Sequence, residues 1–312
     1  MTKQQDSQMN FAFERSLTVT ADEAQLPELL CSSPFFKPIL DRKSADTRGF
    51  DDTDGESYLF DIFEMIRFGP GLDTYDFETL AAVYQIINTK VGMPKSVFQS
   101  MEKVLVEGEH RRLPNFDDID LGVQQEPISG TITTQFRFDI TTATAINRYL
   151  NRDVGSKSLQ ACRDSITRLS RNHFDLVNHE SGRRDVRVPF FRMQQNKRGA
   201  YLIVFPHQME MLFKVLLDFD LKAFSELPSV GQAMMLWMST THGEQSMLLD
   251  DARQRTNYQR PLAEFKRDCV TGRPSKNIRP VLEIMQELDF IDAWEITGTG
   301  RKTPFQLKYT RP

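Results

Sequence analysis

Basic side chains recur along one face of residues 156–171, SKSLQACRDSITRLSR. Leu159, Cys162, Ile166 and Leu169 follow one another at intervals of three, four and three residues, which predicts a helix with a single buried stripe. The opposite face carries Lys157, Gln160, Arg163, Thr167, Arg168 and Arg171. Lysine and arginine neutralise phosphates, while arginine reads guanine and glutamine reads adenine in a major groove. This pattern therefore predicts a surface that binds double-stranded DNA.

A second basic group follows in a predicted hairpin. Segments FDLVNH and VRVPFFRM have the composition of strands, and residues 180–185 between them include Gly182, Arg183 and Arg184. A hairpin with such a tip can reach phosphates or the neighbouring minor groove. Helix and hairpin together favour DNA binding over the alternative that these elements pack only on a protein partner.

The surrounding elements have an order that can position this surface. TITTQFRFDI (131–140) predicts a strand, TATAINRYLNR (142–152) a short helix, and Ser156 caps the basic helix after a turn. The hairpin follows, and then a third strand, AYLIVF. This is the order of a winged helix-turn-helix. Upstream, residues 57–68 predict one strand, and Asp76 is expected to cap a helix over DFETLAAVYQIINTK.

The same order recurs towards the end of the chain. Helices are expected in SVGQAMMLWMSTTHG, MLLDDARQRTN, RPLAEFKRDC and NIRPVLEIMQELDF, with TGRPSK interrupting the last two. IDAWEI and FQLKYTR then form a hairpin with a basic tip. We therefore predict an α+β protein with tandem winged-helix domains. The predicted boundaries are a flexible tail over 1–45, a first domain over 46–220 with an inserted acidic loop at 108–130, and a second domain over 221–312.

The charge distribution agrees with two basic domains. The net charge is −4 overall, but residues 1–130 carry 12 basic and 23 acidic side chains, and residues 131–312 carry 27 basic and 20 acidic ones. Such asymmetry indicates a nucleic-acid partner. Solvated helix faces are the alternative explanation.

Other classes of protein have little support in the sequence. No apolar run approaches the roughly 18 residues that cross a bilayer, no secretory signal is apparent, and the three cysteines are odd in number and far apart. We expect a reduced, cytoplasmic protein with no membrane contact. No P-loop, zinc-protease motif or nucleophile elbow occurs, and His173 and His179 lack a third metal ligand nearby. We expect neither an enzyme nor a bound metal or cofactor.

Three stretches resemble plasmid replication initiators with two winged-helix domains, of the TrfA, RepC and RepE type, with the TrfA-like and RepC-like branches nearest. They are FDIFEMIRFGPGLDTYDFETLAAVYQI, SKSLQACRDSITRLSRNHFDLVNHESGRR, and RPLAEFKRDC with IRPVLEIMQELDFIDAWEI. The resemblance spans roughly residues 57–311. The acidic first third departs from the family, whose members are often basic overall.

The resemblance implies a function at a plasmid origin. Such proteins bind direct repeats called iterons, help to melt an AT-rich stretch, recruit the host initiator DnaA and the replicative helicase, and often interconvert between dimer and monomer. Carried over by position, the DNA-binding residues are Lys157, Ser158, Gln160, Arg163, Thr167, Arg168, Arg171, Arg183 and Arg184 in the first domain. Those of the second domain are Arg260, Lys266, Arg267, Arg273, Lys276, Arg301 and Lys302. Residues 25–30, QLPELL, also resemble a sliding-clamp peptide faintly.

Two other functions remain open at this stage. A winged-helix repressor, or an autorepressor, would bind a palindromic operator as a stable dimer. A winged-helix scaffold would bind only protein and would show no DNA affinity. The position of DNA in the second domain is also open, because either RPLAEFKRDC or the TGRPSK interruption could enter the groove.

Overall fold

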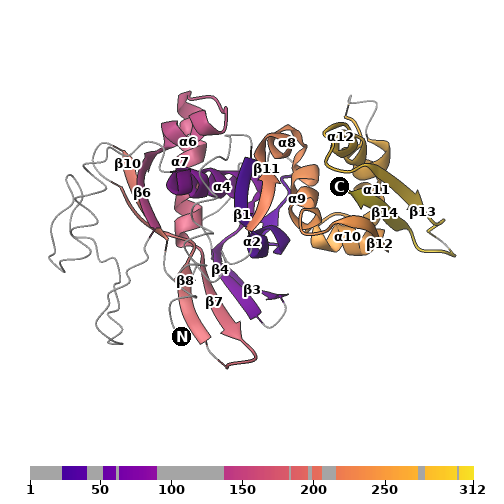
Figure 1. Cartoon of the computed structure of the whole chain (residues 1–312), viewed down its shortest axis with the longest axis horizontal. Helices are drawn as coiled ribbons and strands as arrows, with labels where there is room; N and C mark the ends of the chain where they lie inside the picture. The colour runs from indigo at the N-terminus through magenta and orange to yellow at the C-terminus, as the bar shows by residue number, and fades with distance from the viewer. Residues whose placement is uncertain are drawn as a thin grey trace, which may run out of the picture.

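The structure is a computed structural model of a mixed α/β chain (Figure 1). It describes residues 23–40, 52–60, 63–89, 137–182, 184–195, 199–205, 216–272, 278–300 and 302–312. We call residues 52–205 the first unit and residues 221–312 the second unit. In these described ranges, no helix has the length and apolar character needed to cross a membrane.

The first unit is built around a long helix, α4 (Thr74–Thr89). Strand β6 (Arg137–Thr142) leads into helix α6 (Ala143–Tyr149), where the Thr142 hydroxyl caps the helix by accepting from the Ala145 amide. Helix α7 (Ser156–Arg171) follows after a turn. Its N-cap is Gly155, which makes no side-chain capping bond, so the predicted Ser156 cap is wrong by one residue. The predicted stripe is confirmed, because Cys162, Ile166 and Leu169 are fully buried.

The strands of the first unit form two sheets. One has the order β3-β4-β7-β8 and the other the order β6-β10-β9. The strands are β3 (Asp52–Phe60), β4 (Phe63–Pro70), β7 (His173–Asn178), β8 (Arg184–Pro189), β9 (Arg192–Gln195) and β10 (Ala200–Phe205).

Two predicted strands are divided in the structure. Residues 57–68 form parts of the antiparallel hairpin β3–β4, in which Tyr58 pairs with Met65, rather than one strand. VRVPFFRM is split between β8 and β9, which join different sheets. Phe190 and Phe191 lie between those two strands and are fully buried, so the chain changes sheets at an apolar anchor.

The second unit repeats the order of helix, strand, helices and hairpin. Its sheet has the order β12-β14-β13, so that the last strand lies between the other two. The elements are α8 (Leu221–Glu226), α9 (Ser229–Met238), β12 (Gly243–Leu248), α10 (Leu249–Arg255), α11 (Leu262–Lys266), the π-helix η3 (Arg267–Thr271), α12 (Val281–Glu287), β13 (Ala293–Thr297) and β14 (Gln306–Arg311).

Strand β12 was not predicted. GEQSML alternates weakly, and it is ordered by pairing with β14, where Met247 lies opposite Leu307. The predicted alternation in the final strand is confirmed, because Leu307 and Tyr309 are buried while Gln306 and Lys308 are exposed. A local sequence pattern is therefore sufficient for β14 but not for its polar edge partner.

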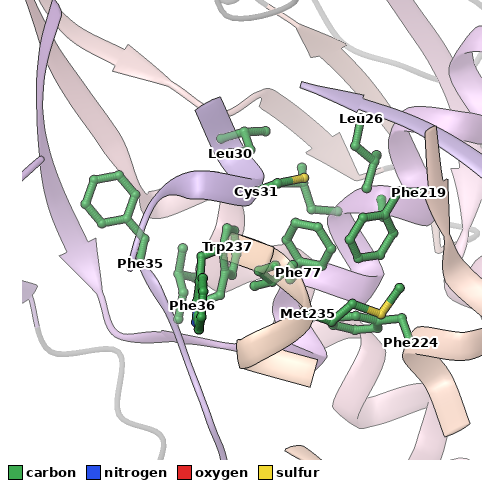
Figure 2. Close-up of a cluster of buried hydrophobic side chains, with 14 of the residues drawn as sticks. Leu26, Leu30, Cys31, Phe35, Phe36, Phe77, Phe219, Phe224, Met235 and Trp237 are labelled. Carbon is green, nitrogen blue, oxygen red and sulfur yellow. The ribbon is translucent and has the colours of Figure 1, made fainter. Parts of the chain in front are cut away.

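Residues 23–40 are not part of a free tail. Strand β1 (Glu23–Pro27), helix α2 (Glu28–Ser32) and strand β2 (Phe36–Lys37) pair and pack with later elements, including β5 (Leu72–Asp73) and β11 (Leu216–Asp220). Leu26, Leu30 and Cys31 are buried with Phe77 and Phe219 (Figure 2). This corrects the predicted tail over residues 1–45 for the part that the structure describes, residues 23–40. It also argues against the clamp-binding interpretation, since a clamp would have to extract Leu26 and Leu30 from the core.

The buried apolar side chains form one continuous cluster across both units. The Phe224 ring of α8 packs against Phe77 of α4 with ring centroids 5.4 Å apart, and Met235 and Trp237 of α9 belong to the same cluster (Figure 2). The predicted boundary at 220/221 falls between β11 and α8, and it stays a prediction. The predicted acidic loop at 108–130 lies outside the described residues.

Candidate nucleic-acid interface

Helix α7 presents a polar face to solvent. Lys157, Gln160, Arg163 and Arg171 are all exposed. The amide of Gln160 donates to Asp164 one turn later, at 2.9 Å, which orients the side chain along the helix surface. This face can supply cations for phosphates and both planar groups, guanidinium and amide, that pair with purine edges.

Ser158 and Thr167 are half-buried, and their hydroxyls are used within the protein. Ser158 Oγ accepts from the amide of the buried Asn147 at 3.0 Å, and the same amide donates to the Asp153 carbonyl at 2.9 Å. Thr167 Oγ1 donates to the Arg163 carbonyl at 2.8 Å. Asn147 thus ties α6 and the turn to the first residues of α7, a positioning role that the sequence analysis missed.

Arg168 does not lie on the exposed face, which corrects its predicted role in DNA binding. Its side chain is 4% exposed and forms an ion pair with Asp76 of α4, with Nη2 and Oδ1 2.6 Å apart. Ser165 Oγ donates to the same carboxylate oxygen at 2.6 Å. Burial alone would lower the pKa of Arg168, but the hydrogen bonds and charge of Asp76 outweigh it and raise that pKa. The predicted cap is displaced, because α4 begins at Thr74: Asp73 Oδ1 accepts from the Asp76 amide and Asp76 Oδ2 accepts from the Asp73 amide, both at 3.2 Å. From this first turn Asp76 also joins α4 to α7.

A second buried arginine holds the C-terminal end of α7. Arg67 of β4 is fully buried and donates to the Pro70 carbonyl at 2.8 Å, to Asn172 Oδ1, and to Glu56 at 2.6 Å. Asn172 is the C-cap of α7. Arg67 lies two residues after buried Met65, so it stands on the core face of the strand. A charged residue at an inward position was the sequence signal that could have revealed this network.

The turn before α7 is held as well. Arg152 forms an ion pair with Glu78 of α4, and its guanidinium lies 3.7 Å from the centre of the Tyr75 ring. The start, middle and end of α7 are thus each fixed to a neighbouring element. A helix held in this way presents its outer side chains with little loss of conformational entropy on binding.

The hairpin β7–β8 presents Arg184, whose side chain is 59% exposed. It pairs with Asp175 at 2.8 Å, and Asp175 also accepts from the Arg187 amide at 3.0 Å. Burial opposes ionisation of Asp175, but the bonds from Arg184 and Arg187 outweigh it and lower the pKa of this carboxyl. At the tip, Gly182 has φ +70°, a conformation that favours glycine. Arg183 lies outside the described residues.

His173 is the first residue of strand β7 and His179 directly follows the strand, and the two side chains make different contacts. His173 is half-buried and stacks on Phe68 with ring centroids 5.4 Å apart. His179 is exposed, with Nε2 3.3 Å from Glu64.

Of the four candidate cations that the structure describes in the second unit, three make contacts within the chain. Arg260 donates to the Leu40 carbonyl at 3.2 Å, and Arg267 pairs with Glu264 at 3.3 Å. The Lys266 ammonium lies 3.5 Å from the centre of the Phe305 ring. Lys302 is exposed in the β13–β14 connection. Arg273, Lys276 and Arg301 lie outside the described residues.

Helix α12 precedes the hairpin of the second unit as α7 precedes that of the first. Its exposed side chains are Glu283, Gln286 and Glu287. Arg279 forms an ion pair with Glu287, and the hydrogen bond and the positive charge of Arg279 lower the pKa of the Glu287 carboxyl. The two counterpart helices therefore differ in charge, basic in the first unit and acidic in the second.

The chain matches no known family, and its similarity to solved structures is low. No protein-family model matches the chain, and no curated protein matches it. A selenomethionine derivative of domains 2 and 3 of RctB aligns with a TM-score of 0.49 and 12% identity, over 92% of this chain and 98% of that one. A second structure of RctB domains 2–3 aligns with a TM-score of 0.45 and 9% identity, over 91% and 97%. Similarity at this level carries no inference about function.

Proposed function

We propose that the chain binds double-stranded DNA through α7 and the β7–β8 hairpin, and that it acts as a replication initiator. One observation carries the DNA-binding part. Lys157, Gln160, Arg163 and Arg171 face solvent from a helix whose other contacts are fixed by buried polar networks. An exposed polar face on a rigid α-helix suits the major groove, which is wide enough to admit it.

The order of elements supports a tandem winged-helix arrangement. In each unit a helix, a strand, further helices and an antiparallel hairpin follow one another. The hairpin of the second unit belongs to a three-stranded sheet with β12, whereas the β7–β8 hairpin joins β4 instead of β6. We therefore propose that the first unit is a variant winged helix. In it, strand β4 of an added hairpin, β3–β4, pairs with the wing β7–β8 in the position that β6 would otherwise occupy.

The initiator role rests on the sequence resemblance to plasmid initiators. Two different units in one chain read two different half-sites, about one helical turn apart, so one chain covers roughly 20 base pairs without internal symmetry. Directly repeated sites suit such a chain better than a palindrome. The same proposal includes three further points. The chain recruits DnaA and the replicative helicase, it opens the origin without catalysing a reaction, and it works in the cytoplasm bound to a plasmid.

The test is DNase I footprinting of the purified protein on DNA that flanks its own gene, at two salt concentrations. We expect protection of several direct repeats of about 20 base pairs, weaker at the higher salt because bound phosphates release counterions. One palindromic footprint would favour the repressor function instead. Absence of any footprint with folded protein would refute DNA binding and leave the protein-binding scaffold.

A further inference from the structure

We propose that residues 33–40, which we call the strap, hold the two units in one relative orientation and thereby set the distance between the half-sites that the chain reads. The geometric part of this inference concerns the protein alone. The half-site part rests on the proposed function.

The strap is anchored in the first unit by two aromatic side chains. Phe35 and Phe36 are 1% and 2% exposed. The Phe36 ring packs edge-on against Phe77 of α4 with centroids 5.1 Å apart, and Phe35 lies 5.9 Å from Phe174 of β7. Consecutive residues thus reach a helix and a strand of the same unit, which fixes the position of the strap backbone.

The strap backbone contacts the second unit at three places. The Asn257 amide donates to the Pro34 carbonyl at 2.9 Å, and Arg260 donates to the Leu40 carbonyl at 3.2 Å. The Ile39 amide donates to Ser229 Oγ at 2.6 Å. Ser229 begins α9, while Asn257 and Arg260 lie between α10 and α11. The contacts therefore involve the first residue of α9 and the connection between α10 and α11.

Ser229 also contacts the first unit directly. Its Oγ lies 2.8 Å from Thr74 Oγ1, and Thr74 is the first residue of α4. One hydroxyl therefore joins the first residues of α4 and α9 to the strap. Phe36 of the strap and Trp237 of α9, both labelled in Figure 2, belong to the same buried apolar cluster, so apolar burial accompanies these polar bonds.

The strap is further linked to the end of α7. Lys37 pairs with Glu56 at 2.7 Å, and Glu56 pairs with Arg67, which binds the C-cap residue Asn172. Arg260, which contacts the last residue of the strap, lies two residues before the start of α11 at Leu262. The strap thus connects the support of the first reading helix to the start of the candidate reading region in the second unit.

The first experiment needs no DNA. Spin labels at Ala145→Cys and Glu295→Cys, both exposed positions, report the distance between the units by double electron–electron resonance, because the three native cysteines are buried. The strap variant combines Asn257→Gly, Ser229→Ala and Arg260→Ala. Asn257 has φ +52°, so glycine keeps the backbone conformation and removes only the side chain.

We expect one narrow distance distribution in the parent protein and a distribution at least about twice as wide in the strap variant. Asn151→Gly is the matched control, because Asn151 also has φ +52° and follows a helix, α6, without contacting the strap. It should leave the width unchanged. An unchanged width in the strap variant, with the fold intact by circular dichroism, would overturn the proposal.

The second experiment uses the footprinted site and duplexes with one to five base pairs inserted between its halves. Because five base pairs turn the second half-site by about half a turn, we expect the parent protein to lose at least about tenfold in affinity. The Asn257→Gly/Ser229→Ala variant, which keeps Arg260, should lose less than about threefold. Equal losses in both proteins would overturn the spacing role. Failure of the parent to bind any duplex would instead refute the proposed function and leave the resonance result to decide the geometric part.

Discussion

Lys157 and Arg163 share the exposed face of α7 but are expected to contribute differently to binding. Arg163→Ala should cost about 1–3 kcal/mol and relax the preference at one base position, as expected for loss of a guanidinium on a base edge. Lys157→Ala should weaken binding to all DNA sequences about equally and reduce the slope of log affinity against log salt concentration by about 1. Fluorescence anisotropy at several salt concentrations separates the two effects.

Lys222→Ala is the control for these substitutions, since Lys222 is exposed on α8, outside the candidate interface. It should leave both affinity and salt slope unchanged. If Arg163→Ala retained the parent affinity and slope, α7 would be misassigned as the reading helix.

Arg168 is expected to matter for stability instead of DNA contact. Arg168→Ala leaves the Asp76 carboxylate buried without its cation, so the free energy of unfolding should fall by about 3–5 kcal/mol. Urea denaturation measures this, with Arg163→Ala as a matched arginine on the exposed face of the same helix, expected to change stability by no more than about 0.5 kcal/mol. Unchanged stability combined with weaker DNA binding would show that Arg168 faces DNA after all.

At the scale of single elements, local patterns predict what they directly encode. The buried stripe of α7 and the alternation of β14 depend on spacing within one element, and both are present. The residue with which a neighbouring side chain pairs cannot be predicted from such spacing. Arg168 faces inwards because its guanidinium forms an ion pair with Asp76, on a helix far away in the sequence. The spacing of residues within α7 does not reveal this pair.

The strands show the same limit. Residues 57–68 have the composition of a strand throughout, and the antiparallel pairing of Phe60 with Phe63 divides them. Residues 1–45 are predicted to be a tail because they are polar on the whole and interrupted by proline, yet Phe35 and Phe36 are buried against Phe174 and Phe77. Such contacts form between residues distant in sequence, which is why a composition argument misplaces this segment.

Glu56 gives the network between the strap and α7 a dependence on pH. Burial opposes ionisation of Glu56, but hydrogen bonds from Lys37 and Arg67 outweigh it, so its pKa lies below the ordinary value of 4.5. Because the folded-state pKa is the lower one, this carboxylate stabilises the fold fully above pH 4.5 and loses its contribution as the pH falls through the folded value.

Glu56→Gln should therefore lower stability at neutral pH and flatten the decline of the free energy of unfolding below pH 4.5. Urea denaturation at a series of pH values measures both effects. Glu226→Gln, at an exposed glutamate of α8, is the control and should leave the profile unchanged. An undiminished acid decline in Glu56→Gln would assign the pH dependence to other carboxyl groups.

For the whole molecule, the sequence predicts that one order of elements occurs twice, because the helices and the hairpin of each unit follow one another along the chain. It does not predict how the copies are joined. The buried cluster runs through both units, and the segment that joins them comes from the N-terminal side of the first. The contacts that fix this arrangement link residues such as Pro34 and Asn257, whose proximity has no local signal.

The two units are expected to contribute unequally to affinity. The exposed face of α7 is basic, whereas that of α12 is acidic, and Arg260, Lys266 and Arg267 are engaged within the chain. Counterion release and base contacts should therefore come mainly from the first unit. The affinity of a site should depend more strongly on the half that lies beneath α7.

Two duplexes test this asymmetry, each with one half of the footprinted site scrambled. Because each mismatched base pair costs about 1–3 kcal/mol, scrambling the half beneath α7 should weaken binding by at least about 1,000-fold, and scrambling the other half by only about 10- to 50-fold. In Arg163→Ala the difference between the two duplexes should shrink, since the contact that makes the first half important is gone, whereas Lys222→Ala should preserve it. Equal losses for the two duplexes in the parent protein would show that the second unit reads DNA as strongly as the first, through residues other than the exposed face of α12.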